Sequence, residues 1–254
     1  MRKVLITAIL ILIFQTAVNA QLWKMRRYEV SGGIGTTQFF GDIGGYSQGD
    51  NILGLKDISL KHTRFNISTS ARYRILSDVS VRLNLAFGSF HSTDIKGSNE
   101  DRGFESKTIF FEPAIIGEYY IIKNKGENSY RLMKGSSYPF PKRFFPMVDC
   151  YFFGGFGGLK YSVSPNEMLE PYLTKSGGFT PVIPVGIGAS LTYSGTYNFG
   201  IELGGRYTFS DDIDGYTSAY SKSNDMYYLL TFNFTYKLST LENGRPTFKM
   251  MGRR

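Results

Sequence analysis

The sequence has few of the residues that catalytic and metal sites most often use. Its 254 residues include one cysteine, two histidines and one tryptophan. The lone cysteine, Cys150, excludes a disulfide within the chain. Two histidines without a nucleophile motif make an enzyme a minor alternative. Long apolar runs are also lacking after residue 20, so a membrane-embedded form of the mature chain requires a closed β-barrel.

The one long apolar run lies at the start of the chain. Arg2 and Lys3 precede the apolar stretch Val4–Phe14, and the small residues at 18–20 are typical of a cleavage site. The run is too short to cross about 30 Å of hydrocarbon as a helix. We therefore predict a signal peptide at residues 1–20 and a mature chain that begins at Gln21. Export without disulfides suits a bacterial envelope protein.

Glycine and aromatic residues are abundant, with 29 Gly, 18 Tyr and 21 Phe, which favours an all-β protein. The clearest pattern lies at Tyr197–Ser210, where apolar and polar residues alternate with the period of a strand. Aromatic residues occupy both ends of its apolar face and aliphatic residues the middle. Glu202 and Arg206 lie on the opposite face. This arrangement is typical of a strand between lipid and a closed polar lumen.

Similar patterns recur along the chain and predict an eight-stranded antiparallel transmembrane β-barrel, residues 21–238, with a filled polar lumen. A bulge is expected at Pro113, and the facing of the glycine-rich fifth strand is left open. A basic periplasmic tail, residues 239–254, follows the barrel. The expected strands lie at residues 28–34, 63–76, 79–88, 106–122, 147–163, 181–193, 197–210 and 227–238.

Charged residues on the polar faces of these strands would meet inside the barrel. Eight strands leave room for side chains and little else, so a packed network is expected instead of a conduction path. Acids and bases are interleaved, which favours structural pairing over catalysis. The expected network comprises Arg64, Arg72, Arg74, Arg82, Glu112, Glu118, Glu202 and Arg206.

The two expected rims of the barrel differ in charge. Outer loops are acidic, whereas the periplasmic segments, including the long Lys123–Pro146 connection, are basic. This segregation indicates either an acidic periplasmic partner or a solvated rim. Nucleic acid is disfavoured, because the basic residues lie on loops of an exported barrel. The candidate partner-binding residues are Lys123, Lys125, Arg131, Lys134, Lys142, Arg143, Arg245, Lys249, Arg253 and Arg254.

Two smaller features suggest chemistry and are weighed against simpler interpretations. His62 and His91 lie near expected outer strand ends, where a lipid or ester hydrolase could place a histidine beside a serine and an acid. Residues 212–215, Asp-Ile-Asp-Gly, are similar to the start of a calcium loop but lack its later ligands, so a turn is favoured. No cofactor, metal or catalytic residue is predicted.

The stretch Arg206–Tyr220, RYTFSDDIDGYTSAY, resembles a signature of the PorG-like outer-membrane barrel family of the Bacteroidetes type IX secretion system. The segments YEVSGGIGTTQFFGDIGG, YFFGGFGGLKYS and IPVGIGASLTY agree with it. The resemblance implies a non-enzymatic barrel in the bacterial outer membrane, surrounded by its lipid. It also implies docking to a periplasmic ring of a lipoprotein and a soluble protein. An OmpX-like surface-binding barrel and an outer-membrane hydrolase are the alternatives.

Overall fold

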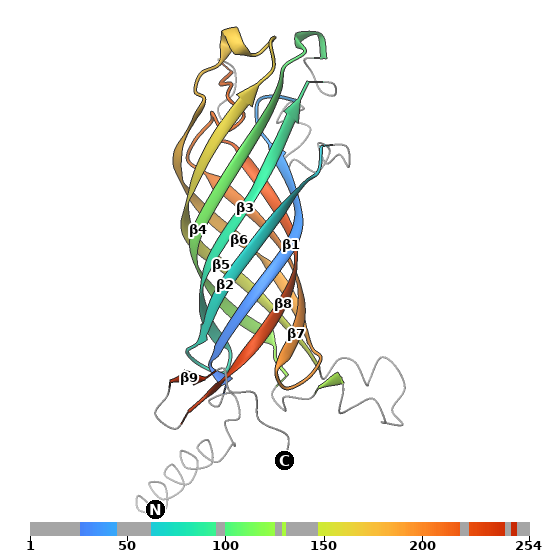
Figure 1. Cartoon of the computed structure of the whole chain (residues 1–254), viewed down its shortest axis with the longest axis vertical. Coiled ribbons are helices and arrows are strands. Elements are labelled where there is room, and N and C mark those ends of the chain that lie inside the picture. Colours follow the sequence, from blue (N-terminus) through green and yellow to red (C-terminus); the bar gives the residue numbers. More distant parts are fainter. Residues whose placement is uncertain are drawn as a thin grey trace, which may run out of the picture.

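Eight antiparallel strands form a closed barrel in the computed structural model (Figure 1). The structure describes residues 26–44, 62–94, 100–124, 129–130, 147–218, 224–241 and 245–247. Each strand pairs with the next, and β1 pairs with β8 over its whole length, which closes the cylinder. The strands are β1 (Tyr28–Phe40), β2 (Arg64–Arg74), β3 (Val79–Thr93), β4 (Glu105–Ile122), β5 (Val148–Pro165), β6 (Gly177–Thr192), β7 (Tyr197–Thr208) and β8 (Met226–Thr240).

Apolar side chains face outward from this cylinder, as the alternation predicts. Phe199, Leu203 and Phe232 are 49 %, 48 % and 55 % exposed. Glu202 and Arg206, on the opposite face of β7, are buried. A soluble barrel would expose the charged set and bury the aliphatic one, because water solvates charge and not hydrocarbon. The predicted fold class is therefore confirmed, with the apolar face turned to the surroundings.

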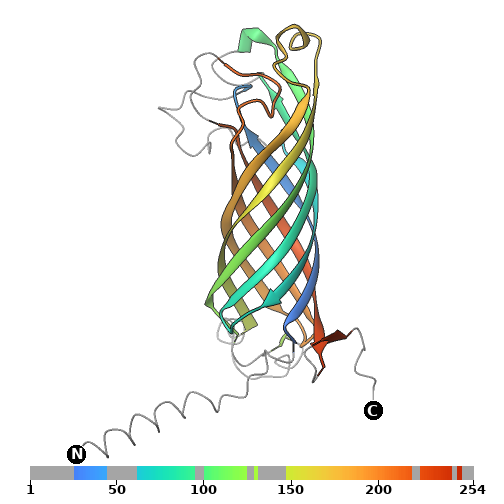
Figure 2. The same cartoon turned by 90° about the vertical axis from the view of Figure 1, so that its left-hand side faces the viewer.

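The two ends of the barrel have different connections (Figures 1 and 2). The short β2–β3 and β6–β7 turns, the start of β1 and the finish of β8 lie at one end, here called the terminal end. The connections β1–β2, β3–β4, β5–β6 and β7–β8 lie at the other, here called the loop end. A two-residue strand, β9 (Pro246–Thr247), pairs with the last residues of β8 and was not predicted. No helix in the described ranges is both long and apolar enough to cross a membrane.

Several strands run further toward the loop end than the sequence pattern indicates. β3 continues to Thr93, where a loop from Phe90 was expected, and β6 begins at Gly177 instead of Pro181. The added residues include Ser92, which lies on the inward face and is buried. Polar side chains can continue a strand wherever they face a lumen that offers hydrogen-bond partners. Polarity alone therefore does not mark the ends of these strands.

The bulge expected at Pro113 is absent. The β3–β4 ladder passes through Leu85 opposite Pro113 without a register shift, and the shift in the β4–β5 ladder falls between Tyr120 and Ile122. Glu112 and Pro113 have no paired residue on β5, and the register is the same at Phe111 and at Ala114 on either side. Proline therefore costs the ladder a donor here without inserting a residue.

Two predicted segments lie outside the described residues. They are the signal peptide, residues 1–20, and most of the Lys123–Pro146 connection.

Candidate functional site: the filled lumen and its loop cap

Interlocked ion pairs fill the lumen toward the terminal end. Arg82 holds Glu202 through two hydrogen bonds of 2.6 Å, and its Nε lies 3.2 Å from Glu118. Arg72 bridges Glu118 and Glu29, with N–O distances of 2.7 and 2.8 Å. All five side chains are at least nine-tenths buried. Each charge therefore has a partner of opposite sign, which a buried charge requires.

Tyrosines complete the hydrogen bonding of these carboxylates. Tyr151 donates to Glu202 at 2.7 Å, and Tyr120 donates to Glu118 at 3.1 Å. Arg74 adds a contact of 2.9 Å to Glu29. We call the eight residues together the charged layer: Glu29, Arg72, Arg74, Arg82, Glu118, Tyr120, Tyr151 and Glu202.

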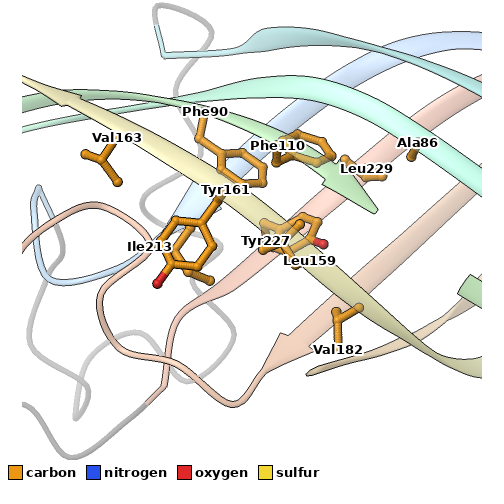
Figure 3. Close-up of a cluster of buried hydrophobic side chains, with 10 residues drawn as sticks. All are labelled: Ala86, Phe90, Phe110, Leu159, Tyr161, Val163, Val182, Ile213, Tyr227 and Leu229. Carbon is orange, nitrogen blue, oxygen red and sulfur yellow. The ribbon is translucent and has the colours of Figure 1, made fainter. Parts of the chain in front are cut away.

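The lumen changes character toward the loop end, where it is mainly apolar. Phe90 stacks on Phe110 with ring centroids 4.3 Å apart, and Tyr227 packs against Phe90 at 4.8 Å (Figure 3). The hydroxyl of Tyr227 donates to Glu112 at 2.6 Å, and Arg206 lies 3.6 Å from the same carboxylate. The prediction of a polar lumen therefore holds only in part. We call the cluster the aromatic layer: Ala86, Phe90, Phe110, Leu159, Tyr161, Val163, Val182, Ile213, Tyr227 and Leu229.

The aromatic layer extends into the loop that carries the RYTFSDDIDGYTSAY stretch. Ile213 of that loop is fully buried within the layer, and its carbonyl accepts a hydrogen bond of 2.8 Å from Thr108 inside the barrel. Gly215 has φ of +89°, a left-handed conformation that favours glycine, and its N–H bonds back to Asp212. The interpretation of residues 212–215 as a turn is confirmed. The turn inserts Ile213 into the barrel mouth.

Buried aspartates join this turn to the neighbouring loops. Asp214 accepts hydrogen bonds from the backbone of Ile43 at 3.0 Å and of Tyr216 at 3.1 Å. Asp225 accepts one from the backbone of Ile213 at 2.8 Å. Carboxylates are strong acceptors for such N–H groups. The acidic motif therefore holds the loops together instead of projecting into solvent.

A second junction lies beside the first. Arg102 makes two hydrogen bonds to Asp94, of 2.7 and 2.9 Å, and its guanidinium lies between the rings of Phe104 and Tyr216 at 4.6 and 4.7 Å. The hydrogen bond to Asp94 is the main cause that raises the pKa of Arg102. Ile43 packs there as well. Residues from all four connections at the loop end thus meet; we call the assembly the loop cap: Ile43, Asp94, Arg102, Phe104, Leu169, Asp212, Ile213, Asp214, Tyr216 and Asp225.

Burial changes the protonation of the cap carboxylates. Burial, with the charges of Asp42 and Asp211 adding to it, raises the pKa of Asp214 to about 7. Burial and the neighbouring Asp214 also raise the pKa of Asp225. At Asp212 burial acts in the same direction, but hydrogen bonds led by that from Lys175 outweigh it and lower the pKa. A proton on Asp214 or Asp225 removes one negative charge and relieves the repulsion among the remaining carboxylates.

The expected network of lumen charges is largely present, with one exception. Arg64 lies at the loop end of β2, opposite Thr37, and its Nη1 donates to the carbonyl of Thr63. It is therefore eight residues from Arg72 along the strand and does not belong to the charged layer. Sequence reasoning missed Glu29, although the alternation placed it on the polar face of the first strand. The structure settles the facing of β5: Asp149 lies inward and is buried, whereas Lys160, of opposite parity, is exposed on the outer face.

Of the predicted rim residues, the structure describes Lys123 and Arg245. The Lys123 side chain is 8 % exposed, with its ammonium 3.8 Å from the ring centre of Tyr120 and 3.9 Å from Asp149. Burial and the charge of Arg74 lower the pKa of Lys123 to about 8. Lys123 therefore lies inward. Arg245 immediately precedes β9. The remaining candidates lie outside the described residues: Lys125, Arg131, Lys134, Lys142, Arg143, Lys249, Arg253 and Arg254.

The two histidines lie together at the loop end, with ring centroids 5.6 Å apart. His91 Nε2 lies 2.8 Å from Glu105, while its Nδ1 has no hydrogen-bond partner among the described residues. The described part of the chain thus gives His91 an acid but no hydroxyl to activate. Nor does any group of three His, Cys, Asp or Glu side chains there have the geometry to hold a metal ion.

Comparison with known proteins gives structural neighbours only. No family model and no curated protein matches the chain. Neisserial surface protein A is 12 % identical over 83 % of this chain and 96 % of its own, with a TM-score of 0.46. Ail of Yersinia pestis, in complex with the heparin analogue sucrose octasulfate, is 14 % identical over 83 % and 98 %, with a TM-score of 0.40. The outer membrane enzyme PagL is 11 % identical over 82 % and 97 %, at 0.32. The strand pairing itself shows the closed eight-stranded barrel. The resemblance to the PorG-like family stays a prediction.

Proposed function

We propose that the chain is a non-enzymatic barrel of the bacterial outer membrane that acts as a structural anchor of the type IX secretion system. In this proposal its periplasmic end docks ring proteins, one a lipoprotein and one soluble. The observation that carries the anchoring role is the filled lumen. Ion pairs among Arg72, Arg82, Glu118 and Glu202 block one level, and the aromatic layer blocks the next. A barrel packed in this way suits support better than conduction.

The docking part rests on charge. Lys249, Arg253 and Arg254 follow β9 in the sequence, and Arg245 immediately precedes β9, which lies at the terminal end. Acidic side chains concentrate at the loop end, although Asp94, Asp214 and Asp225 there are buried in the cap. The proposed docking set therefore excludes Lys123, whose ammonium lies inward, and keeps the basic residues that follow β9. The type IX assignment itself rests on the family resemblance.

The test reverses charge at one end of the barrel at a time. Replacing Lys249, Arg253 and Arg254 by Glu should lower ring co-purification and cargo secretion about tenfold. This corresponds to a loss of about 1.4 kcal/mol of binding free energy at the interface. The matched control reverses three exposed loop-end acids, Asp101→Lys, Glu167→Lys and Glu170→Lys, and should leave both unchanged. Heat-dependent gel mobility checks that every variant contains a folded barrel. Normal secretion and co-purification in the Glu variant would reject the docking proposal.

The surface-binding alternative has one observation in its favour. The loop cap is held by buried hydrogen bonds, and it exposes Met168 and Tyr172, which are 64 % and 63 % accessible. An ordered cap with exposed apolar side chains suits a binding surface better than loose loops would. If Met168→Ser with Tyr172→Ser abolished cell or matrix adhesion and left secretion intact, the surface-binding function would replace the anchor.

A further inference from the structure

The outward face of the barrel carries positive charge in one sector only. By the alternation of β1–β8, Lys107 on β4 and Lys160 on β5 are the only outward-facing lysine or arginine residues in these strands, and both are exposed. Other cations of the strands, such as Arg72, Arg82 and Arg206, are buried in the lumen. The two lysines lie on neighbouring strands and belong to a single patch.

Serine hydroxyls lie between the two lysines. Lys107 pairs with Ser164 across the β4–β5 ladder, and Ser162 lies between Ser164 and Lys160 on the same outward face. Ser164 lies four positions after Lys160 and opposite Lys107, so the two lysine backbones are about 14 Å apart. Each flexible lysine stem spans about 6 Å, which lets the ammonium groups approach each other. We call this set the β4–β5 strip: Lys107, Lys160, Ser162 and Ser164.

The strip lies at the margin of the apolar belt. Ile109, the next outward residue after Lys107, is 54 % exposed, and Phe179, paired with Lys160, is 70 % exposed. Outward-facing tyrosines also lie toward the loop end of β7 and β8, further round the barrel: Tyr207 and Tyr228. A lysine beside a hydrocarbon belt extends its ammonium toward the headgroups, while its stem covers apolar surface. The strip therefore lies at the depth of lipid headgroups on the loop-end side.

One acid lies beside the strip. Glu105, the outward-facing acid next to Lys107 on β4, forms a hydrogen bond of 2.8 Å with His91, and its carboxylate also interacts with the charge of Lys107. Ammonium groups with hydroxyls between them form charge-assisted hydrogen bonds to phosphate oxygens, as the phosphate-binding lysines of other proteins do. One carboxylate beside two ammonium groups leaves this sector with net positive charge, which a phosphate in the headgroup plane neutralises.

We propose that the β4–β5 strip binds the phosphate groups of a phosphorylated outer-leaflet glycolipid, of the lipid A type. This inference rests on the outer-membrane location proposed above and is independent of the secretion role. The ammonium groups of Lys107 and Lys160 hold the phosphates, and Ser162 and Ser164 donate hydrogen bonds between them. One tightly held lipid is expected on this face and none on the aromatic faces of β7 and β8.

The experiment counts bound lipid on the full chain. The protein is inserted into phosphatidylcholine nanodiscs that contain diphosphoryl lipid A, dephosphorylated lipid A or phosphatidylglycerol, and native mass spectrometry counts the lipids that remain after release. Diphosphoryl lipid A should stay bound, whereas K107Q/K160Q should lose about tenfold in retention. K107R/K160R should keep it, since arginine also binds phosphate. Lys175→Gln removes a lysine outside the strip and should have no effect.

Four results would overturn the proposal. Equal retention by the native chain and K107Q/K160Q would show that the strip does not hold the lipid. Equal retention of phosphatidylglycerol would reduce the effect to general attraction of anionic lipid, and equal retention of dephosphorylated lipid A would remove the role of phosphate. Failure of the chain to insert, seen as the absence of a heat-dependent gel shift, would reject the outer-membrane location together with the strip. Insertion with unchanged lipid counts rejects the strip alone.

Discussion

The two layers of the lumen solve the same packing problem with opposite chemistry. In the charged layer Arg82, Arg72 and their carboxylates fill the space and neutralise one another. In the aromatic layer Phe90, Phe110 and Tyr227 fill it with rings. On β3, β4 and β5 residues of both layers share one inward face, so period-two alternation defines which residues face inward but not what they are. The difference predicts different tolerance to substitution.

The largest effect is expected in the charged layer. Arg82→Met leaves Glu202 buried without its main partner and removes one of the two arginines at Glu118, at a cost on the order of 3–5 kcal/mol. Denaturant unfolding in lipid vesicles measures it. The double change Arg82→Met with Glu202→Met removes both charges of the closest pair and should recover most of the loss. A double variant no more stable than Arg82→Met would show that burial of the lone carboxylate is not the source of the cost.

A smaller loss is expected when the aromatic layer is truncated. Leu159 is fully buried, and Leu159→Ala removes methyl groups from a packed cluster, at a cost of about 3 kcal/mol. Leu159→Met keeps the volume and should cost less than about 1.5 kcal/mol. No corresponding mild change exists for Arg82, because Arg82→Lys loses the paired hydrogen bonds to Glu202. If Arg82→Lys were as mild as Leu159→Met in the same unfolding assay, the contrast between the layers would fail.

The charged layer was predictable from sequence, and the aromatic layer was not. Arginines and glutamates on strands of alternating polarity cannot face lipid, so Arg72, Arg82, Glu118 and Glu202 were assigned inward at once. In the fourth strand Phe110 has apolar neighbours on both sides, and only the parity set by Glu112 shows that it faces inward. Polarity thus identifies the inward face, but aromatic residues fit either face of a membrane barrel.

The pairing within the lumen and the loop cap lay beyond sequence reasoning for a different reason. Which carboxylate Arg82 binds depends on the stagger of strands around the closed barrel, and Glu202 is 120 residues away in the chain. The acidic stretch around Asp214 was correctly interpreted as a turn. Its insertion into the barrel mouth through Ile213 depends on contacts with three other loops, which no local pattern records.

The junction between the aromatic layer and the loop cap can be tested at one glycine. A Cβ at Gly215 would lie 2.8 Å from Leu173 and 2.9 Å from Val163, in a left-handed backbone conformation. Gly215→Ala should therefore destabilise the turn by more than the roughly 1–2 kcal/mol that a left-handed conformation alone costs a residue with a Cβ. Gly103→Ala is the matched control, since Gly103 has φ of +64° and nothing within 4 Å of its Cβ position. Hydrogen exchange at the Ile213 amide measures the destabilisation. If Gly215→Ala and Gly103→Ala accelerated exchange of the amides nearest to each substitution equally, the contacts of the Gly215 Cβ with Leu173 and Val163 would contribute nothing.

The smallest effect expected is a pH dependence confined to the loop cap. An aspartate in an unfolded chain titrates near 4, roughly, whereas burial raises the pKa of Asp214 to about 7 and that of Asp211 to about 6. Between these values the closed cap binds more protons than the open one, so its stability falls as pH rises from about 4 to about 7 and levels off above. The lowered pKa of Asp212 works in the opposite sense, with its stabilisation lost only as pH falls below about 4.

Hydrogen exchange at the Ile43 and Tyr216 amides, corrected for intrinsic rates, should show faster opening at pH 8 than at pH 5. Asp214→Asn with Asp225→Asn should remove most of that difference and Asp212→Asn little of it, because asparagine keeps the acceptor oxygen and loses the charge. If the double variant kept the full difference, the carboxylates of the cap would not be its source.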